Sequence, residues 1–194
     1  MRRSCRMRPI VAFQGETGAF SEAAAEQLVP GEITLFPCPS FDATVRAVVN
    51  GHADYAAIPV KNLIAGPVHD ALSAIAQFSS LEHVGEMKLP IHLSLLGLPG
   101  AEVENITEVL SHDIALQQCN LYLAAHPKMR TVEAHDTAGA ARMVGIRRDP
   151  TVAAIAASWA AKHYGLVVLA ERLEDRPDNV TTFTLIRRKS SLQV

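Results

Sequence analysis

The feature that most constrains the fold is a repeated alternation of short apolar runs with longer amphipathic stretches. PIVAF, the loop QGETGAF and SEAAAEQL predict a strand, a glycine-containing turn and a helix with Ser21 as its N-cap. ITLFPC, SFDATVRAVVNG and ADYAAIPV then predict a strand, a helix closed by Gly51 and another strand. Strands that alternate with helices of this length favour an α/β fold with mostly parallel sheets covered by helices.

A second α/β unit follows, from EVLSH through the helices IALQQCNLYLAAH and TAGAARMV to TVAAIA and ASWAAKHYG. The intervening LEHVGEMKLPIHLSLLGLPG contains Pro90 and Pro99, which do not suit a helix, so we interpret it as an extended crossing between two lobes. LVVLAERL and TTFTLIRR are expected to return to the first lobe. We therefore expect residues 1–88 and 167–194 in lobe one and residues 89–166 in lobe two, with an inter-lobe cleft that suits a small ligand.

Composition argues against several classes of function. The formal net charge is −2 and aromatic residues make up 5% of the chain, which does not suit nucleic-acid binding. Three cysteines without the spacing of a metal site or a disulfide framework favour a reducing cytoplasm and no metal. No apolar run approaches the roughly 20 residues of a membrane span. The basic start from Arg2 to Arg8 is interpreted as a tail and not as a signal peptide.

Two stretches of the first lobe carry candidate ligand-binding residues. Gly18 and Ala19 lie where a strand passes into a helix, and the N–H groups of a helix start favour an anion. A tight turn without a ligand is the alternative. Lys61 and Asn62 end a buried strand, and the carboxyl ends of parallel strands face the crevice where ligands bind. Lys61 could meet a carboxylate and Asn62 a keto or hydroxyl group, whereas a solvated lysine and a turn asparagine are the simpler interpretation.

The second lobe carries a further group of polar residues. Ser111 and His112 follow a short strand, and Gln118 lies seven residues after Ser111, a spacing that returns to about the same face of a helix. His112 has no evident nucleophile and acid partner, so a structural role is favoured over a catalytic one. Asp136 or Thr137 caps a helix.

The segment DNVTTFTLI near the C-terminus predicts a turn followed by a strand that begins with Thr181 and Thr182. Threonine is β-branched, so strand propensity alone explains both residues. A hydroxyl at a strand entrance that points into a cleft is the functional alternative.

Six stretches, taken in order, resemble the catalytic domain of prephenate dehydratase: QGETGAFSEAAA, CPSFDATVRAVVNGHADYAAIPVKN, LSHDIALQQC, HDTAGAARM, AAIAASWAAKHYGL and LEDRPDNVTTF. The resemblance runs from about Val11 to Ile186. It implies a two-lobed α/β fold, arranged like that of periplasmic binding proteins, with the substrate between the lobes. It also implies conversion of prephenate to phenylpyruvate, a step of phenylalanine biosynthesis, by a homodimer without a metal or organic cofactor.

The resemblance implies roles for individual residues. Thr181 matches the family's catalytic threonine, whose hydroxyl serves the departing hydroxyl of prephenate. Ser111 and Asn62 are the other residues expected in catalysis. Substrate-binding residues are expected at Lys61, Gln118, Thr137, Phe183, Gly18 and Ala19.

The chain departs from the family pattern on either side of its site. Thr182 stands where the family has arginine, and Lys61 and Leu63 replace the glutamate and the serine or threonine beside Asn62. We interpret Lys61 and Thr182 as one coupled change, after which Lys61 holds a substrate carboxylate. The family's C-terminal ACT-type regulatory domain has no counterpart before Val194, so feedback control is absent, lies on another chain or was lost by shortening.

Two other functions remain open. A related enzyme that decarboxylates prephenate without aromatising it is favoured by the loss of the motif arginine and by the missing regulatory domain, and it is opposed by the retention of Thr181 and Phe183. A catalytically silent module that binds an aromatic precursor is favoured only by Lys61 and Thr182. For the substrate, arogenate is an open alternative to prephenate.

Overall fold

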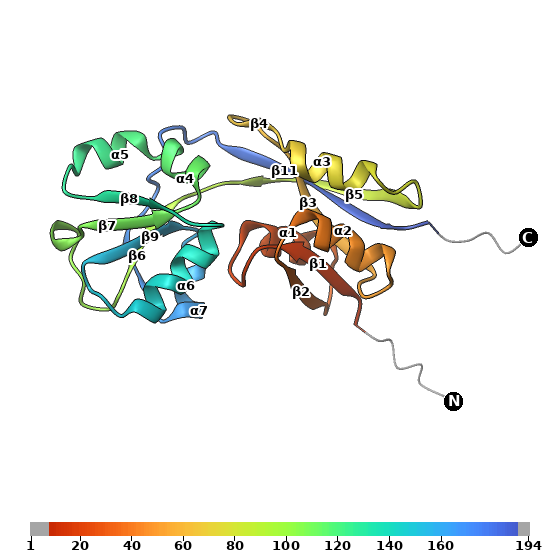
Figure 1. Cartoon of the computed structure of the whole chain (residues 1–194), viewed down its shortest axis with the longest axis horizontal. Coiled ribbons are helices and arrows are strands. Elements are labelled where there is room, and N and C mark those ends of the chain that lie inside the picture. The colour runs from red at the N-terminus through yellow and green to blue at the C-terminus, as the bar shows by residue number, and fades with distance from the viewer. Residues whose placement is uncertain (1–7, 190–194) are drawn as a thin grey trace, which may run out of the picture.

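The computed structural model describes residues 8–189, which form two lobes (Figure 1). Both ends of the described chain lie in the same lobe. Apart from its last residue, the predicted basic tail lies outside the described residues. Each lobe contains a β-sheet with helices on both faces, which confirms the two-lobed α/β fold.

The first lobe is built on one sheet. Its strands, in spatial order, are β2 (Thr34–Cys38), β1 (Ile10–Gln14), β3 (Tyr55–Asn62), β11 (Val180–Arg188) and β5 (Leu81–Pro90), with β4 (Gly66–Pro67) paired to β3. Its helices are α1 (Phe20–Leu28), α2 (Phe41–Val49) and α3 (His69–Ala76). β1 runs parallel to β2 and β3, whereas β11 runs antiparallel to β3 and β5.

Alternating side chains bury both faces of this sheet. Val11, Ala57 and Leu185 pack with α1 on one face, while their neighbours Ala12 and Ile58 pack with α2 and α3 on the other. Successive side chains of a strand point to opposite faces, so an unbroken apolar run is needed where both faces are covered. PIVAF and AAIPV are such runs.

The second lobe is built in the same way. Its strands, in spatial order, are β10 (Val167–Ala170), β6 (Ser94–Gly97), β9 (Val152–Ala156), β7 (Glu108–Ser111) and β8 (Arg130–Glu133). Its helices are η1 (Val103–Asn105), α4 (Asp113–Gln118), α5 (Asn120–Ala125), α6 (Thr137–Arg147) and α7 (Ala160–Tyr164). α4 and α5 cover one face, and α6 and α7 cover the other (Figure 1). Within the described residues, no helix is both long and apolar enough to span a bilayer.

Two predictions about the sheets were wrong. The sheets are mixed and not mostly parallel. In the first sheet, β5 leaves the lobe and β11 returns alongside it in the opposite direction, and in the second sheet β6 runs antiparallel to β9 and β10. β10 pairs with β6, so residues 167–170 belong to the second lobe and the chain crosses back only after them. An apolar run predicts that a strand exists, whereas tertiary packing decides which sheet it joins.

The predicted cap of α1 was also wrong. The helix begins at Phe20, with Ala19 as its N-cap residue, and Ser21 lies buried within the first turn. The carboxylate of Glu22 turns back and accepts a hydrogen bond from the Gly18 N–H at 2.6 Å. The Glu22 carboxylate in the first turn, and not the Ser21 hydroxyl, therefore accepts a backbone N–H at the start of the helix.

Of two further predictions about helix ends, one is confirmed and one is wrong. Gly51 closes α2 with φ +78°, as predicted. The single helix predicted over IALQQCNLYLAAH is instead two short helices, because Cys119 adopts φ −113° and ψ 25°.

The two segments that cross between the lobes lie side by side. The Ile91 N–H donates to the Asn179 carbonyl at 2.9 Å, and the Leu173 N–H donates to the Leu93 carbonyl at 2.8 Å. The buried carboxylate of Glu174 accepts a further bond from the Leu93 N–H at 2.9 Å. The lobes are thus joined by a paired connection and not by two independent linkers.

Candidate active site

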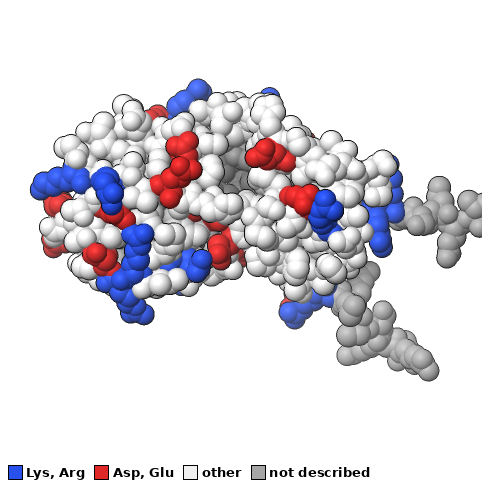
Figure 2. Space-filling model, viewed as in Figure 1, with Lys and Arg blue, Asp and Glu red and all other residues white. Residues whose placement is uncertain are grey.

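A cleft of about 900 Å³ lies between the lobes, as predicted. Figure 2 shows the hollow, with acidic side chains on both sides of it. Its walls are formed largely by residues that follow the carboxyl ends of β1, β2 and β3 in one lobe and of β7 and β8 in the other. This is the edge of an α/β sheet at which ligands usually bind, and the volume suits a small molecule.

Helix starts supply most of the favourable environment for an anion. The first residues of four helices line the cleft: Phe20 of α1, Phe41 of α2, His69 of α3 and Thr137 of α6. The first N–H groups of a helix have no intrahelical partner and lie at the positive end of its dipole. A carboxylate in the cleft can therefore be bound by backbone N–H groups from either lobe.

The charged side chains in the cleft are negative, so they do not add to the positive field of the helix starts. Asp70, Glu133 and Asp136 line it, whereas no lysine or arginine of residues 8–189 is among those that form its walls. The Asp136 carboxylate accepts a hydrogen bond from the Gly139 N–H at 2.7 Å, which makes it the N-cap of α6. Of the two predicted caps, Asp136 is the one that the structure confirms, and Thr137 is the first residue of the helix.

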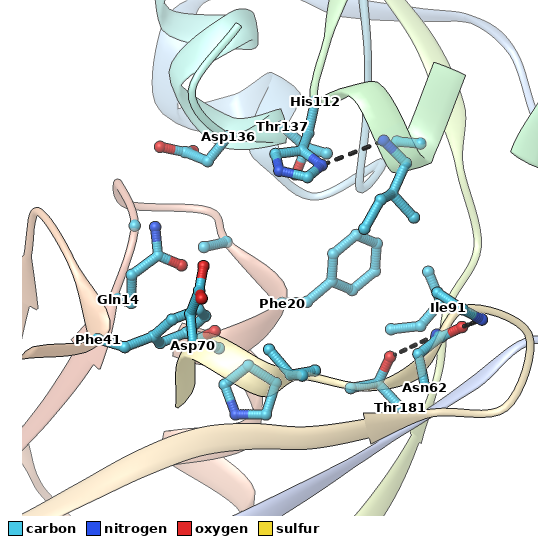
Figure 3. A pocket seen from close by; sticks show the side chains of 18 of the residues that line it. Gln14, Phe20, Phe41, Asn62, Asp70, Ile91, His112, Asp136, Thr137 and Thr181 are labelled. Atoms are coloured by element: carbon cyan, nitrogen blue, oxygen red, sulfur yellow. Dashed lines mark hydrogen bonds between the residues drawn. The ribbon is translucent and has the colours of Figure 1, made fainter. Parts of the chain in front are cut away.

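Thr181 lies on the opposite wall from Thr137 (Figure 3). Its hydroxyl oxygen accepts a hydrogen bond from the Asn62 amide nitrogen at 2.9 Å. Within residues 8–189, no hydrogen bond uses the hydroxyl hydrogen of Thr181. That hydrogen is therefore free to be donated to a ligand, although the residue is only 8% exposed.

Asn62 is held in place by the turn that follows β3. Its side-chain oxygen accepts hydrogen bonds from the N–H groups of Ile64 at 3.0 Å and Ala65 at 2.9 Å. Its amide nitrogen donates to Thr181 and also to the side-chain oxygen of Asn179 at 2.9 Å. Asn62 thus stabilises the turn with its oxygen and lines the cleft, so the turn role and the ligand-binding role considered for it are compatible.

Gln118 brings the second lobe into contact with this group. It is the last residue of α4 and lines the cleft. Its side-chain oxygen accepts a hydrogen bond from the Asn179 amide nitrogen at 2.9 Å. Gln118, Asn179, Asn62 and Thr181 therefore form one chain of hydrogen bonds that joins the two lobes beside the cleft.

The predicted site residues that line the cleft are Thr181, Asn62, Gln118, Thr137, Phe183 and Ala19. Ser111, Lys61 and Gly18 lie elsewhere.

Ser111 is part of the core of the second lobe and not of the cleft wall. It is fully buried at the end of β7, and its hydroxyl donates to the Ile155 carbonyl at 2.6 Å. The spacing of seven between Ser111 and Gln118 carries no information here, because Ser111 lies in a strand and the helix begins only at Asp113. His112 does line the cleft, where its Nδ1 accepts from the Ile114 N–H at 3.3 Å, as a capping residue does.

Lys61 is exposed and lies outside the cleft. Asn62 faces the cleft, and the preceding residue of a strand points to the other face of the sheet. Thr182 is paired with Lys61 across β3 and with Lys88 across β5. The two departures from the family pattern are therefore neighbours, as the coupled change requires, but they lie on the face of the sheet away from the cleft.

Gly18 makes a contact between the lobes and does not line the cleft. Its N–H is used by Glu22, so it is not available to an anion. Its φ is +90°, and a Cβ atom there would lie 3.0 Å from both the Cα and the Cβ of Ala160 in α7. Gly18 is required by close packing against the other lobe.

Other contacts join the lobes near this loop. The Tyr164 hydroxyl donates to the Thr17 carbonyl at 2.6 Å, and Arg142 forms an ion pair with Glu16 at 3.2 Å. Burial, and then the nearby Glu16 carboxylate, raise the pKa of Tyr164 to about 12. We call these two contacts the loop latch; they lie on α6 and α7, away from the paired crossings (Figure 1).

Three kinds of site residue could not be predicted from the sequence. Asn179 was treated only as part of a turn, although it directly precedes the strand of Thr181. Phe20 and Phe41 line the cleft as the first residues of their helices. No sequence pattern at a helix start predicts that an aromatic side chain faces a ligand. Ile91 lines it from the first crossing. Among the described residues, no His, Cys, Asp and Glu side chains form a group that could hold a metal ion.

The fold and the cleft define a class of two-lobed α/β proteins that bind a small molecule between their lobes. Within that class, the model of the prephenate dehydratase family matches residues 11–191. The chain belongs to the prephenate dehydratase family.

Individual relatives agree with this assignment. Arogenate dehydratase 1 of Petunia hybrida is 40% identical over 180 residues, which are 92% of this chain and 42% of that protein. A prephenate dehydratase from Arthrobacter aurescens, solved in complex with L-Phe, is 36% identical with a TM-score of 0.86, covering 94% of this chain and 61% of that one. A structure described as GqqA, a novel type of quorum quenching acylase, is 34% identical with a TM-score of 0.83, covering 94% and 65%. This chain thus spans less than half the length of the petunia protein.

Proposed function

We propose that the chain catalyses the decarboxylating dehydration of prephenate or of its amino analogue arogenate, yielding phenylpyruvate or phenylalanine. Family membership supports the reaction class. The observation that carries the proposal is the Thr181 hydroxyl, whose oxygen is fixed by Asn62 and whose hydrogen is free at the cleft. One oriented proton donor is the chemical group that this reaction needs most.

The main task of the protein in this reaction is to orient the substrate. The bond between the ring and its carboxylate breaks, the electron pair moves through the ring, and the bond to the ring hydroxyl breaks. Carbon dioxide leaves, the departing oxygen takes up a proton and leaves as water, and the ring becomes aromatic. Aromatisation supplies the driving force, so the protein has to position the substrate and assist the departing hydroxyl.

Thr181 assists best through a hydrogen bond and not as a free acid, since an alcohol is a weak acid. The bond strengthens as negative charge develops on the departing oxygen, which makes it stronger in the transition state than in the bound substrate. The helix starts that line the cleft, among them those of α1 and α6 in opposite lobes, are the groups that we expect to bind the substrate carboxylates.

The position of Lys61 and Thr182 favours this reaction over decarboxylation without aromatisation. The loss of the family's arginine is one of the two features that favour the latter. Both residues lie on the face of the sheet away from the cleft, so the change does not alter the walls around the substrate.

For the substrate, the charge of the cleft favours arogenate. Asp70 and Glu133 line it, and no lysine or arginine in the described part of the chain does. Arogenate carries an ammonium group that carboxylates attract, whereas prephenate carries a keto group there and has only negative charges. The relation to the petunia arogenate dehydratase supports the same choice.

Product analysis with each substrate in turn tests the proposal. We expect phenylalanine from arogenate and phenylpyruvate from prephenate, with the higher kcat/KM for arogenate. Asp70→Asn should narrow that difference, while the matched control Lys88→Gln, on the outer face of the sheet, should leave it unchanged. A non-aromatic keto acid from prephenate would establish the decarboxylase instead, and binding without turnover would establish a binding module.

A further inference from the structure

We propose that Asn179 is a positioning residue that sets which polar atoms Gln118 and Thr181 present to the substrate. The inference rests on the proposed function of the cleft. Asn179 is fully buried and does not line the cleft, so it acts only through its two neighbours. It lies where the second crossing segment enters β11, and its carbonyl accepts from the Ile91 N–H of the first crossing at 2.9 Å.

The direction of the hydrogen bonds is set at the turn after β3. The N–H groups of Ile64 and Ala65 can only donate, so the atom of the Asn62 side chain that they contact must be its oxygen. The amide nitrogen of Asn62 must then face Asn179 and Thr181, and it donates to both. Backbone donors thereby remove the usual ambiguity of an asparagine orientation.

The orientation of Asn179 determines the direction of the hydrogen bond to Gln118 in the other lobe. Because its oxygen accepts from Asn62, its nitrogen is left to donate to the oxygen of Gln118. The Gln118 nitrogen therefore faces away from Asn179 with both hydrogens, and within residues 8–189 it donates to no protein acceptor. The result is an N–H donor in the cleft, on the opposite lobe from the hydroxyl of Thr181.

Asparagine is suited to this position because it carries one acceptor and one donor on a short side chain. Aspartate is an acceptor on both sides when ionised. An ionised carboxylate would still accept from Asn62, but it would force Gln118 to turn its nitrogen inward and present its oxygen to the cleft. An acceptor would then replace a donor beside an anionic substrate.

Asn179→Asp tests the inference without removing the side chain. Above the pKa of the new carboxyl group, kcat/KM should fall about tenfold or more, the loss expected for one hydrogen bond to a charged group. As the pH falls, the protonated carboxyl can donate to Gln118, so the ratio of variant to wild-type kcat/KM should rise. A ratio that does not change with pH would overturn the inference, since a merely structural loss has no reason to reverse in acid.

A second measurement does not depend on turnover. In the wild type, the Gln118 side-chain N–H signals should exchange rapidly with solvent in ¹⁵N NMR spectra, while those of Asn179 are protected. In Asn179→Asp at high pH, the Gln118 signals should become protected. Unchanged Gln118 signals would overturn the inference. Absence of turnover by the wild type would overturn the proposed function alone, and the NMR result would still decide the role of Asn179.

Discussion

Thr181 lies where β11 enters the first lobe, and its environment accounts for a threonine more fully than strand propensity does. Its oxygen accepts from Asn62 and its hydrogen is free. Thr181→Val keeps the shape and the β-branching but removes the hydroxyl. We expect kcat to fall about 10²-fold or more, because the contact is made chiefly with the departing oxygen in the transition state, while KM changes little.

Thr181→Ser is the matched control, since it keeps the hydroxyl and loses only a methyl group. It should retain part of the activity. Steady-state kinetics on both variants with arogenate and prephenate make the comparison. Normal turnover by Thr181→Val would return Thr181 to the role of an ordinary strand residue.

The two lysines that flank Thr182 in the sheet lead to a second prediction. Thr182 lies between Lys61 and Lys88 in neighbouring strands, so Thr182→Arg places three cations in a row. Adding Lys61→Glu supplies an opposite charge directly across from the arginine. The double variant should be more stable than the sum of the single effects by about 0.2–1 kcal/mol, the range for cross-strand pairs.

Urea unfolding of the four proteins measures this coupling, and kinetics on the same proteins test where Lys61 acts. Because Lys61 lies outside the cleft, Lys61→Glu should leave KM unchanged. A strongly raised KM would mean that the lysine reaches the substrate after all, as the sequence alone led us to expect.

At the scale of elements, the loop between β1 and α1 is packed against α7 of the other lobe. Gly18→Ala strains the backbone at φ +90° and also brings a methyl group to 3.0 Å from the backbone of Ala160. Gly31→Ala is the matched control, since its φ is +103° but no atom of the described residues lies within 4 Å of the added Cβ. Both variants carry backbone strain of about 1–2 kcal/mol.

Only Gly18→Ala should therefore also force α7 away from the loop. We expect it to lower the free energy of unfolding further than Gly31→Ala does and to raise KM, because the cleft walls are displaced. Thermal unfolding and steady-state kinetics test both statements. Equal effects of the two substitutions would show that the contact with Ala160 relaxes without cost.

For the whole molecule, the paired crossings and the loop latch together hold the lobes around the cleft. Tyr164→Phe removes the hydrogen bond to the Thr17 carbonyl and keeps the ring. One such bond is worth about 0.5–1.5 kcal/mol, so KM should rise by roughly twofold to tenfold, because the loop latch holds the two walls of the cleft together. Small-angle scattering of the unliganded protein should show a larger radius of gyration for the variant.

The pKa of Tyr164 sets the pH range of that effect. It is raised to about 12 in the folded protein, above the ordinary value of about 10, so folding favours the protonated phenol. This contribution to stability is complete below the ordinary pKa and is lost as the pH rises through about 12. The difference in unfolding free energy between wild type and Tyr164→Phe should therefore be constant around neutral pH and shrink in strong alkali. A difference that varied near pH 7 would point to another titrating group.

Most of the strands and helices and their order along the chain could be predicted from the sequence, although the start of α1 and the break at Cys119 could not. The apolar runs PIVAF and AAIPV form strands, Asp136 caps a helix, and Gly51 ends one. These features depend on residues a few positions apart, so their signals are present in the chain itself. The ordered motifs also sufficed to predict the family and six residues that line the cleft, among them Asn62, Gln118 and Thr181.

The full set of side chains around the cleft depends on how distant segments pack. Ser111 and Lys61 lie beside residues of the cleft in sequence but belong to the core and to the outer surface, because one step along a strand reverses the face. β10 joined the second sheet and Asn179 came between Asn62 and Gln118 through contacts between distant segments. Strand pairing and hydrogen-bond direction between distant residues are set by packing in three dimensions, which no local pattern of the sequence encodes.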